Sequence, residues 1–390
     1  MDEILATLAA AGISAYGSSV TALDAYFGRK PAPLRFYLAL CSLQDLARAF
    51  EGLEYPGLPY ADAALGPGRG AGEGACFRCA DSLAEAEAAA FAPLDLLAEG
   101  RPGYFQDPKD AYPKLRERRL EPRPAPAELQ YFEAAALLGR YDYELGPAAL
   151  PAPPRDFRAR AQRDLLSLVL TGPRPEAALG LLLETGFVAA YWPELAALSG
   201  LGQSKEYHPE GDAWAHTMET FRHRKLPSLT LSLALLLHDA GKPAAESAEG
   251  RRFDRHAEIG RALAERFLRR LGFAPALVED VSFLVRYHML PAALPRLPAN
   301  RLEGLIDDAR FPLLLELYKC DELSTFRGPD GYYEACAAYR AHLRDSRNPW
   351  GAAEGKRLAR LWLEDSPRGP APARGAASRG AARRVGARHG

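Results

Sequence analysis

An apolar helical run that ends in two adjacent polar side chains constrains this chain more than any other feature. The stretch LLLHDAGKP, residues 235–243, places His238 and Asp239 directly after three leucines. Burying an imidazole and a carboxylate beside such a run costs free energy unless a partner binds them. Gly241 and Pro243 end or kink the helix, which opens its end toward a cavity. The pattern therefore predicts a bound metal ion at this position.

More imidazole and carboxylate groups occur in helical contexts nearby. His216 lies in WAHTMETF, His256 in FDRHAEIG, His288 in LVRYHML and Asp321 in LYKCDELS. Imidazole and carboxylate together suit Mn, Ni, Fe, Mg or Zn and leave open positions for water. One or two divalent metal ions are therefore expected, with a candidate ligand set of His216, His238, Asp239, His256, His288 and Asp321.

Size and composition limit the class of protein. A chain of 390 residues with 48% hydrophobic residues is long enough for two or three domains. A net charge of −1 argues against a protein that coats nucleic acid over its whole surface, although a local basic patch remains compatible with it. The five cysteines do not form a disulfide pattern, the start MDEILATLAA does not look like a signal peptide, and LTLSLALLL is too short to span a bilayer. We expect a cytoplasmic protein without a membrane segment.

The pattern of apolar residues and prolines divides the chain into four parts. Strand-like runs such as LRFYLAL alternate with helical stretches up to residue 121, and two Pro-rich segments flank a helix in the next part. Apolar residues then recur at helical spacing. We predict an α+β fold, with a small α/β head at 1–121, a helical neck at 122–200, an all-α domain at 201–364 and a disordered Arg-rich tail at 365–390.

The metal-ligand candidates resemble the HD superfamily of metal-dependent phosphohydrolases, whose signature here reads HDAGK. The surrounding text, with WPEL and HPEGD followed by AHT, resembles the segment that joins head and HD domain in bacterial tRNA nucleotidyltransferases, the CCA-adding enzymes. This resemblance covers about residues 157–325. It implies a nucleotidyltransferase-like head, an RNA-binding-like connector and an HD phosphohydrolase domain.

The resemblance also implies roles for individual residues. His216, His238, Asp239 and Asp321 would hold a first metal, and His256 and His288 a second, with Asp239 bridging the two. Asp239 and Lys242 are the candidate catalytic residues, and Lys242 would neutralise a phosphate oxygen. His208, Asp212 and Lys242 are the candidate substrate-binding residues. For His208 and Asp212 a role in helix entry and capping remains equally open, and for Lys242 a solvated charge after a helix end.

The resemblance of the head is fainter, and its carboxylates differ. In AYGSSVTALDAYFGRKPAPLRFYLAL the family's glycine pair becomes Gly17-Ser18, and its two strand aspartates fall on Arg35 and Tyr37. An arginine and a tyrosine cannot hold magnesium against a triphosphate. The helix that carries nucleotide-reading arginines in the family has Gln130, Glu133 and Ala134 at the critical positions. The head is therefore expected to keep the fold without the chemistry.

We interpret the chain as a metal-dependent phosphohydrolase acting on a nucleotide, a cyclic nucleotide phosphate or an RNA-end phosphate ester, with tRNA-like RNA as a further partner. Two alternatives stay open. A CCA-adding nucleotidyltransferase would need other carboxylates, such as Asp24 or Asp45, as metal ligands. A non-enzymatic RNA- or nucleotide-binding regulator would be expected to lose its metal ligands, whereas every ligand position is filled here.

Overall fold

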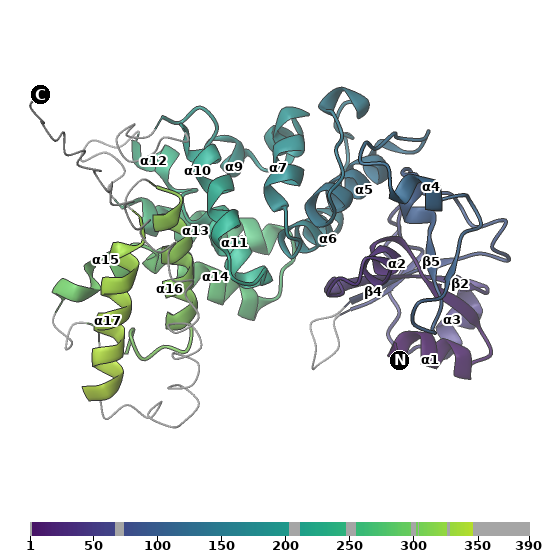
Figure 1. Cartoon of the computed structure of the whole chain (residues 1–390), viewed down its shortest axis with the longest axis horizontal. Helices are drawn as coiled ribbons and strands as arrows, with labels where there is room; N and C mark the ends of the chain where they lie inside the picture. Colours follow the sequence, from purple (N-terminus) through teal and green to yellow (C-terminus); the bar gives the residue numbers. More distant parts are fainter. Residues whose placement is uncertain are drawn as a thin grey trace, which may run out of the picture.

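A computed structural model describes residues 2–66, 74–202, 211–246, 255–297, 302, 304–325 and 328–345. The molecule is elongated, with an α/β head at one end, a helical neck in the middle and an all-helical part at the other end (Figure 1). The predicted α+β class is confirmed. The predicted tail at 365–390 lies outside the described residues.

The head is built on a six-stranded sheet with the strand order β3-β4-β2-β1-β5-β6. Only the β2–β4 pair among the assigned strand pairs is parallel. The strands are β1 (Ser14–Gly17), β2 (Leu34–Leu40), β3 (Ala63–Leu65), β4 (Gly74–Cys79), β5 (Leu97–Ala98) and β6 (Phe105–Gln106), and the helices are α1 (Glu3–Ala10), α2 (Ser19–Tyr26), α3 (Leu43–Ala49) and α4 (Tyr112–Leu115) with the 3-10 turn η1 (Ala92–Asp95). The run LRFYLAL thus forms the central strand.

Alternate residues of β2 face different layers, because side chains of a strand alternate between the two sides of a sheet. Tyr37 and Ala39 pack in a small core with Leu8 of α1 and Leu46 of α3. Phe36 instead joins the main core, which is continuous from the head into the helical half of the chain. The head is therefore not an independent core but shares apolar packing with the neck.

The neck consists of α5 (Ala127–Arg140), α6 (Ala159–Leu170), α7 (Pro175–Glu184), α8 (Phe187–Tyr191) and α9 (Pro193–Ala196), with η2 (Pro147–Ala149) after α5. A buried ion pair attaches it to the head: Arg140 Nη2 at the end of α5 lies 2.7 Å from Asp24 Oδ2 in α2. Tyr141 donates its hydroxyl proton to the other oxygen of Asp24 at 2.8 Å. Each buried charge thus has a partner, which makes its burial tolerable.

The C-terminal half consists only of helices among the described residues. They are α10 (Ala213–Thr220), η3 (Phe221–His223), α11 (Leu229–Leu237), α12 (Lys242–Glu246), α13 (His256–Arg270), α14 (Pro275–Tyr287), α15 (Leu290–Ala293), η4 (Leu294–Arg296), α16 (Phe311–Leu323) and α17 (Asp330–Asp345). Residues 231–237 of α11 are all buried, so this helix is the centre of the domain. None of the described helices has both the length and the apolar character needed to cross a membrane.

Candidate metal centre

Five helices bring the six candidate ligands to one place. His216 lies inside α10 and Asp321 inside α16, whereas His256 is the first residue of α13. His238 and His288 each follow the last residue of a helix, α11 and α14, and Asp239 follows His238. Ser228 caps α11 by accepting a hydrogen bond from the Leu231 amide, which fixes where this helix begins.

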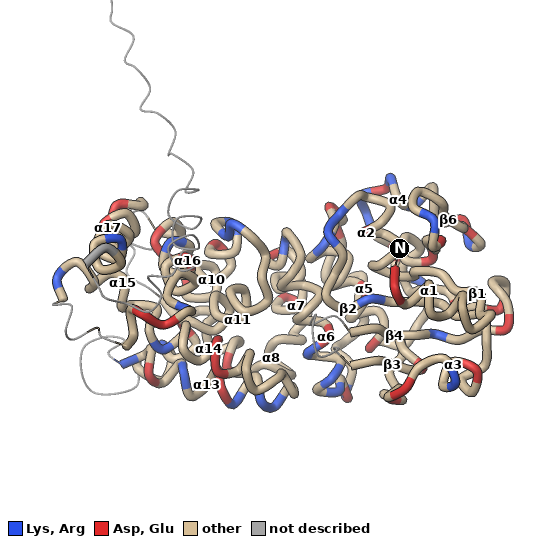
Figure 2. The backbone as a smooth tube through the Cα atoms, turned by 90° about the horizontal axis from the view of Figure 1, so that it is seen from below, with Lys and Arg blue, Asp and Glu red and all other residues tan. Residues whose placement is uncertain are grey.

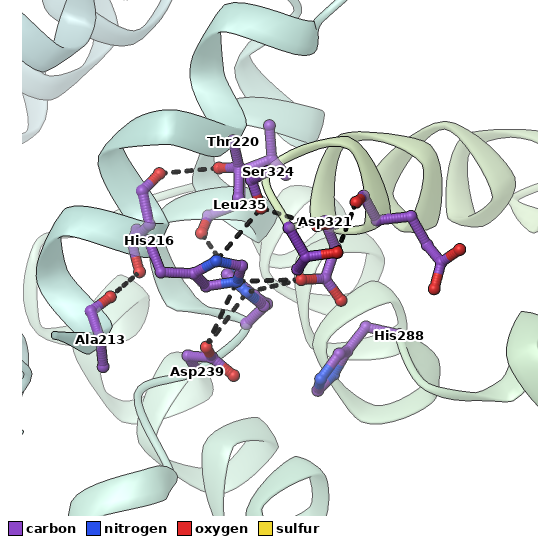
Figure 3. Close-up of polar contacts among 12 residues, drawn as sticks. Ala213, His216, Thr220, Leu235, Asp239, His288, Asp321 and Ser324 are labelled. Atoms are coloured by element: carbon purple, nitrogen blue, oxygen red, sulfur yellow. Dashed lines mark hydrogen bonds and ion pairs between the residues drawn. The ribbon is translucent and has the colours of Figure 1, made fainter. Parts of the chain in front are cut away.

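The six side chains form two adjacent groups. Within each group the potential ligand atoms all lie within 4.8 Å of one another. His216, His238 and Asp321 make the first group, and Asp239, His256 and His288 the second. Figure 3 shows the His216 ring beside Asp321 and Asp239. The Nε2 atom of His216 lies 2.9 Å from Asp321 Oδ1, and the Nε2 atoms of His256 and His288 are 3.1 Å apart.

Asp239 lies between the two groups and turns one oxygen toward each. Its Oδ2 is 3.3 Å from His238 Nε2 and 3.8 Å from His216 Nε2, on the side of the first group. Its Oδ1 is 3.7 Å from His256 Nε2, on the side of the second. This is the arrangement that a carboxylate bridging two cations requires.

Hydrogen bonds fix the orientation of three of the histidine rings. The Nδ1 atoms of His238 and His288 each lie 2.7 Å from the carbonyl oxygen three residues earlier, Leu235 and Val285. A carbonyl only accepts, so each Nδ1 carries the proton and each Nε2 keeps a lone pair. The Nε2 atom of His238 is buried and has no hydrogen-bond partner among the described residues. A metal ion would satisfy it.

His216 is oriented by a side chain instead of a carbonyl. The Ser324 hydroxyl donates to the Asp321 carbonyl at 2.6 Å, so its oxygen accepts from His216 Nδ1 at 3.1 Å. The lone pair on His216 Nε2 then faces the carboxylate of Asp321. Two electron-rich atoms 2.9 Å apart need a cation between or beside them. The residues present therefore fit a metal ion.

The protonation states also suit metal binding. Burial lowers the pKa of His238 and lowers that of His288 to about 4, so both rings are neutral near pH 7. Burial disfavours charge on Asp239 and Asp321, but attraction to the neighbouring imidazoles, and to Lys242 for Asp239, outweighs it and lowers the pKa of both carboxyl groups. Neutral imidazoles and ionised carboxylates are the forms that bind a metal.

The centre is deep but open on one side. His216, His238, Asp239 and His288 are at most 2% exposed, whereas the side chains of Asp321 and His256 are 19% and 13% exposed. Lys242 is buried, and its Nζ lies 2.6 Å from Asp239 Oδ2. The ammonium thus compensates the charge of the Asp239 carboxylate.

Of the two remaining candidates for substrate binding, Asp212 and His208, the structure describes only Asp212. Asp212 accepts hydrogen bonds from the amides of Ala215 at 2.8 Å and Gly200 at 2.6 Å, so it caps α10 and holds the preceding turn. This geometry favours the capping alternative for Asp212. His208 lies outside the described residues.

A close backbone contact holds the two halves of the centre together. A Cβ atom at Gly241 would lie 2.1 Å from the His256 carbonyl oxygen and 2.6 Å from the Gly260 amide nitrogen. Only glycine therefore allows the turn after Asp239 to approach the first turn of α13, which carries His256. The sequence motif HDAGK thus contains a packing requirement as well as ligands.

Sequence reasoning did not identify the groups that orient the histidines. Ser324 and the carbonyls of Leu235 and Val285 act through His216, His238 and His288. The signal for Ser324 was present, since a hydroxyl three residues after Asp321 lies on the same side of the helix. Backbone carbonyls leave no signal in a sequence.

The head contains a cavity of about 470 Å³ at the place where the sequence analysis put the lost carboxylates. Phe36 and Leu38 of β2 line it, together with Arg78 of β4 and Glu133 of α5. Phe36 contacts the Tyr60 and Phe132 rings, and these two rings stack at 3.8 Å. The strand therefore contributes Phe36, Tyr37 and Leu38 to the lining but no carboxylate, and carboxylates such as Asp62 and Asp95 reach the cavity from other segments.

Tyr37 also lines this cavity, whereas Arg35 does not, and the polar ends of both side chains contact a residue outside it. Both reach Asp2 before α1: Arg35 Nη1 at 3.0 Å and the Tyr37 hydroxyl at 2.8 Å. Burial, together with the Asp2 charge, raises the pKa of the Tyr37 hydroxyl. The two positions that align with the family's aspartates thus form a structural contact with the N-terminal helix.

The other carboxylates considered for the head are occupied elsewhere. Asp24 is buried against Arg140 and Tyr141, and its Oδ2 also accepts from the Ala32 amide. Asp45 lies in the first turn of α3 and pairs with Arg48 on the surface. The two lie on different helices and bind different partners. Among the described residues, both groups of potential metal ligands lie in the C-terminal half.

Comparisons with known proteins identify one domain family in this chain and several relatives of it. The model of the HD domain family matches residues 213–324, which include all six candidate ligands. A CC-adding tRNA nucleotidyltransferase of Thermus thermophilus is 35% identical over 236 residues, covering 57% of this chain and 51% of that protein. A bifunctional uridylyltransferase/uridylyl-removing enzyme of Ruegeria pomeroyi is 30% identical over 190 residues, covering 41% of this chain and 20% of that protein.

A solved structure extends the likeness to the fold of nearly the whole chain. The CCA-adding enzyme of Bacillus stearothermophilus, solved in complex with CTP, has a TM-score of 0.51 at 16% identity, covering 94% of this chain and 88% of that one. At this identity the likeness concerns the fold alone. The chain spans about half the length of the Thermus relative and a fifth of the Ruegeria relative.

Proposed function

Since this chain carries an HD domain and is homologous to CCA-adding tRNA nucleotidyltransferases, we propose that it is an enzyme of nucleotide or RNA chemistry whose metal centre hydrolyses a phosphate ester. The observation that carries the proposal is the pair of ligand groups joined by Asp239. The substrate classes we propose are nucleotides, cyclic nucleotide phosphates and RNA-end phosphates.

In this proposal six side chains bind the cations, and other groups orient the histidines among them. His216, His238 and Asp321 would hold one cation and His256 and His288 the other, and Asp239 would contribute to both. Divalent cations in such a site supply Lewis acidity and lower the pKa of water toward neutrality. Ser324 and two backbone carbonyls keep the Nε2 lone pairs directed at the centre.

We assign to Lys242 the stabilisation of negative charge on the phosphate. Its ammonium lies 2.6 Å from Asp239 and therefore at the edge of the centre. A positive charge fixed in a buried site stabilises developing negative charge better than one in water. Exposure of Asp321 and His256 on the open side gives the ester a path to the centre.

The experiment that tests the hydrolase proposal is a substrate panel. The full-length protein is freed of metal with a chelator, supplied with Mn²⁺ or Ni²⁺, and assayed for phosphate release or ring opening on p-nitrophenyl phosphate, 2′,3′-cyclic nucleotides and 3′-phosphorylated RNA. Turnover that needs added metal supports the proposal. Absence of turnover on the entire panel with both metals contradicts it.

A second candidate function is nucleotidyl transfer to tRNA, which the homology to CCA-adding enzymes supports at least as well. Against it stand Arg35 and Tyr37 of β2, which occupy the positions that align with the family's two aspartates, so that the carboxylates of the head cavity, such as Asp62 and Asp95, come from other segments. Incorporation of radiolabelled CTP into a tRNA lacking its 3′ end tests it directly. Incorporation would assign the head a transferase activity, whereas none is expected if the head keeps only the fold.

A further inference from the structure

A cavity of about 530 Å³ lies between the helices α13 and α14 and contains none of the six metal-ligand candidates. Its wall on α13 is formed by residues at positions 261, 265 and 269, and on α14 by positions 278, 282 and 286, each set spaced four residues apart along one helix face. We propose that this groove binds single-stranded RNA, with a backbone phosphate between its arginines and a base on its aromatic rings.

The charge of the groove suits a phosphate. Four arginines line it, and two of them are compensated: Arg269 pairs with Glu265 at 2.7 Å and Arg310 with Asp308 at 2.7 Å. The structure records no carboxylate partner for Arg261 or Arg286 among the described residues. Two guanidinium groups on facing helices thus remain available for one anion.

Two acidic residues also line the groove. Glu265 is engaged by Arg269, and the side chain of Glu279 is 77% exposed and 3.5 Å from Arg310. Figure 2 shows basic and acidic positions side by side along the part of the tube labelled α13 and α14. Glu265 and Glu279 therefore pair with Arg269 and Arg310. The guanidinium groups of Arg261 and Arg286 can contact a ligand.

Aromatic rings alternate with the arginines. Phe283 and Tyr287 lie one helical turn apart with ring centroids 5.0 Å from each other. The Arg310 guanidinium lies 4.1 Å from the Phe283 ring centre and that of Arg286 lies 5.4 Å from the Tyr287 ring centre. Rings and guanidinium planes of this kind stack on nucleobases without regard to sequence.

Ser282 provides a third, independent observation. Its side chain lines the groove, the residue is only 6% exposed, and its hydroxyl has no hydrogen-bond partner among the described residues. A buried hydroxyl without a partner costs free energy that a ligand oxygen would recover. The hydroxyl lies one helical turn before Arg286, on the same face of α14.

The combination of features favours RNA over a free phosphate ion. Two arginines and a hydroxyl would satisfy either ligand, but the ring faces of Phe283 and Tyr287 add binding only for a ligand that carries a base. The same two helices bear His256 and His288 at their ends, so the groove and the metal centre share their supporting elements. The inference does not depend on hydrolysis at that centre.

Binding of a fluorescein-labelled single-stranded RNA of about ten nucleotides, within the usual site size of ~4–16, tests the proposal by fluorescence anisotropy. Arg261→Gln/Arg286→Gln is expected to weaken binding about tenfold, and Arg261→Gln alone, at an exposed residue, about threefold. Because both arginines contact the same phosphate, their joint loss should also reduce the salt slope by roughly 0.7, the value for one phosphate contact on a single strand. Ser282→Ala should weaken binding about threefold.

The matched control is Arg266→Gln, which removes the same charge from α13 at an exposed residue outside the groove. Its binding should equal that of the unaltered protein, and the thermal midpoint of each variant shows whether it is folded. Equal binding by the double variant and by Arg266→Gln overturns the proposal. Displacement of the RNA by inorganic phosphate at constant ionic strength, as effective as by unlabelled RNA, also overturns it and assigns the groove to free phosphate.

Discussion

His238 shows how a single residue is prepared for metal binding. Its Nδ1 proton is held by the Leu235 carbonyl, its Nε2 lone pair is buried without a hydrogen-bond partner, and burial keeps the ring neutral. Burial of such a side chain in the apolar core is unfavourable in free energy, and binding a cation would offset that cost. His288 shares two of these features, since its Nδ1 is held by the Val285 carbonyl and burial lowers its pKa to about 4.

His238→Gln removes the directed lone pair while keeping a polar side chain of similar length. We expect the protein to lose at least one bound metal ion per chain and its hydrolase activity to fall by about 100-fold or more, since even residues that only orient a ligand contribute 10–100-fold. Elemental analysis and turnover measure the two effects. His223→Gln, in the same domain but outside the ligand groups, should retain both; a similar loss there would contradict the assignment.

Glu133 provides a pH-dependent prediction outside the metal centre. Burial raises its pKa to about 8 from an ordinary value of 4.5, so the folded protein keeps a proton that the unfolded chain releases between these values. The unfolding free energy therefore decreases as pH rises through this window, by at most about 1.4 kcal/mol per pKa unit. Above pH 8 the contribution is constant.

Glu133→Gln should remove this contribution, because a neutral amide replaces the protonated acid. Thermal midpoints at pH 5 and pH 8 should show a larger decrease for the unaltered protein than for the variant. Other titrating groups are common to both proteins and cancel in the comparison. Parallel pH profiles would show that Glu133 is ionised when folded.

At the scale of elements, the contact between the turn after α11 and the start of α13 sets the spacing of the ligand groups. Gly241→Ala would place a methyl group 2.1 Å from the His256 carbonyl oxygen. Because only backbone movement relieves this clash, we expect a loss of about 1–3 kcal/mol in stability and weaker metal binding. Denaturant unfolding and metal titration measure these effects.

Gly180→Ala is the matched control for this substitution. Gly180 lies inside α7, and a Cβ there would meet no atom within 4 Å. Alanine is the better helix former, so this variant should gain about 0.5–1 kcal/mol. If Gly241→Ala were as well tolerated, the close approach between the turn and α13 would not be a constraint.

The elements also show what the sequence could and could not predict. Spacing predicted the strand at 34–40 and the helical C-terminal half, because each depends on local periodicity. The ligand set was predicted from rare residue types, and its role in metal binding stays a prediction. The contact of Arg35 and Tyr37 with Asp2 could not be predicted, since Asp2 is distant from both in the chain. The groove between α13 and α14 also escaped notice, because its arginines belong to two helices.

At the scale of the whole molecule, one core runs from Val20 in the head to Tyr339 in α17. The buried pair of Asp24 and Arg140 adds a polar connection between head and neck. Such continuity has a thermodynamic consequence. Head and HD domain should unfold together.

Metal binding should then stabilise the entire chain. A cation present at about 100 times its Kd stabilises the folded state by about 2.7 kcal/mol, so a chelator should lower the midpoint of a single thermal transition by several degrees. Scanning calorimetry with and without chelator measures this. Two separate transitions, of which one is insensitive to metal, would contradict the shared core.

The most direct test of the proposed two-metal centre is to measure how many ions bind per chain and whether their electron spins are coupled. Chelator-treated protein is titrated with Mn²⁺ and followed by electron paramagnetic resonance, beside Asp239→Asn as the variant that lacks the bridging carboxylate. Two ions per chain with coupled spins, and uncoupled or missing ions in the variant, are the predicted result. A protein that shows no saturable Mn²⁺ binding would contradict the claim that these six side chains form a two-metal centre.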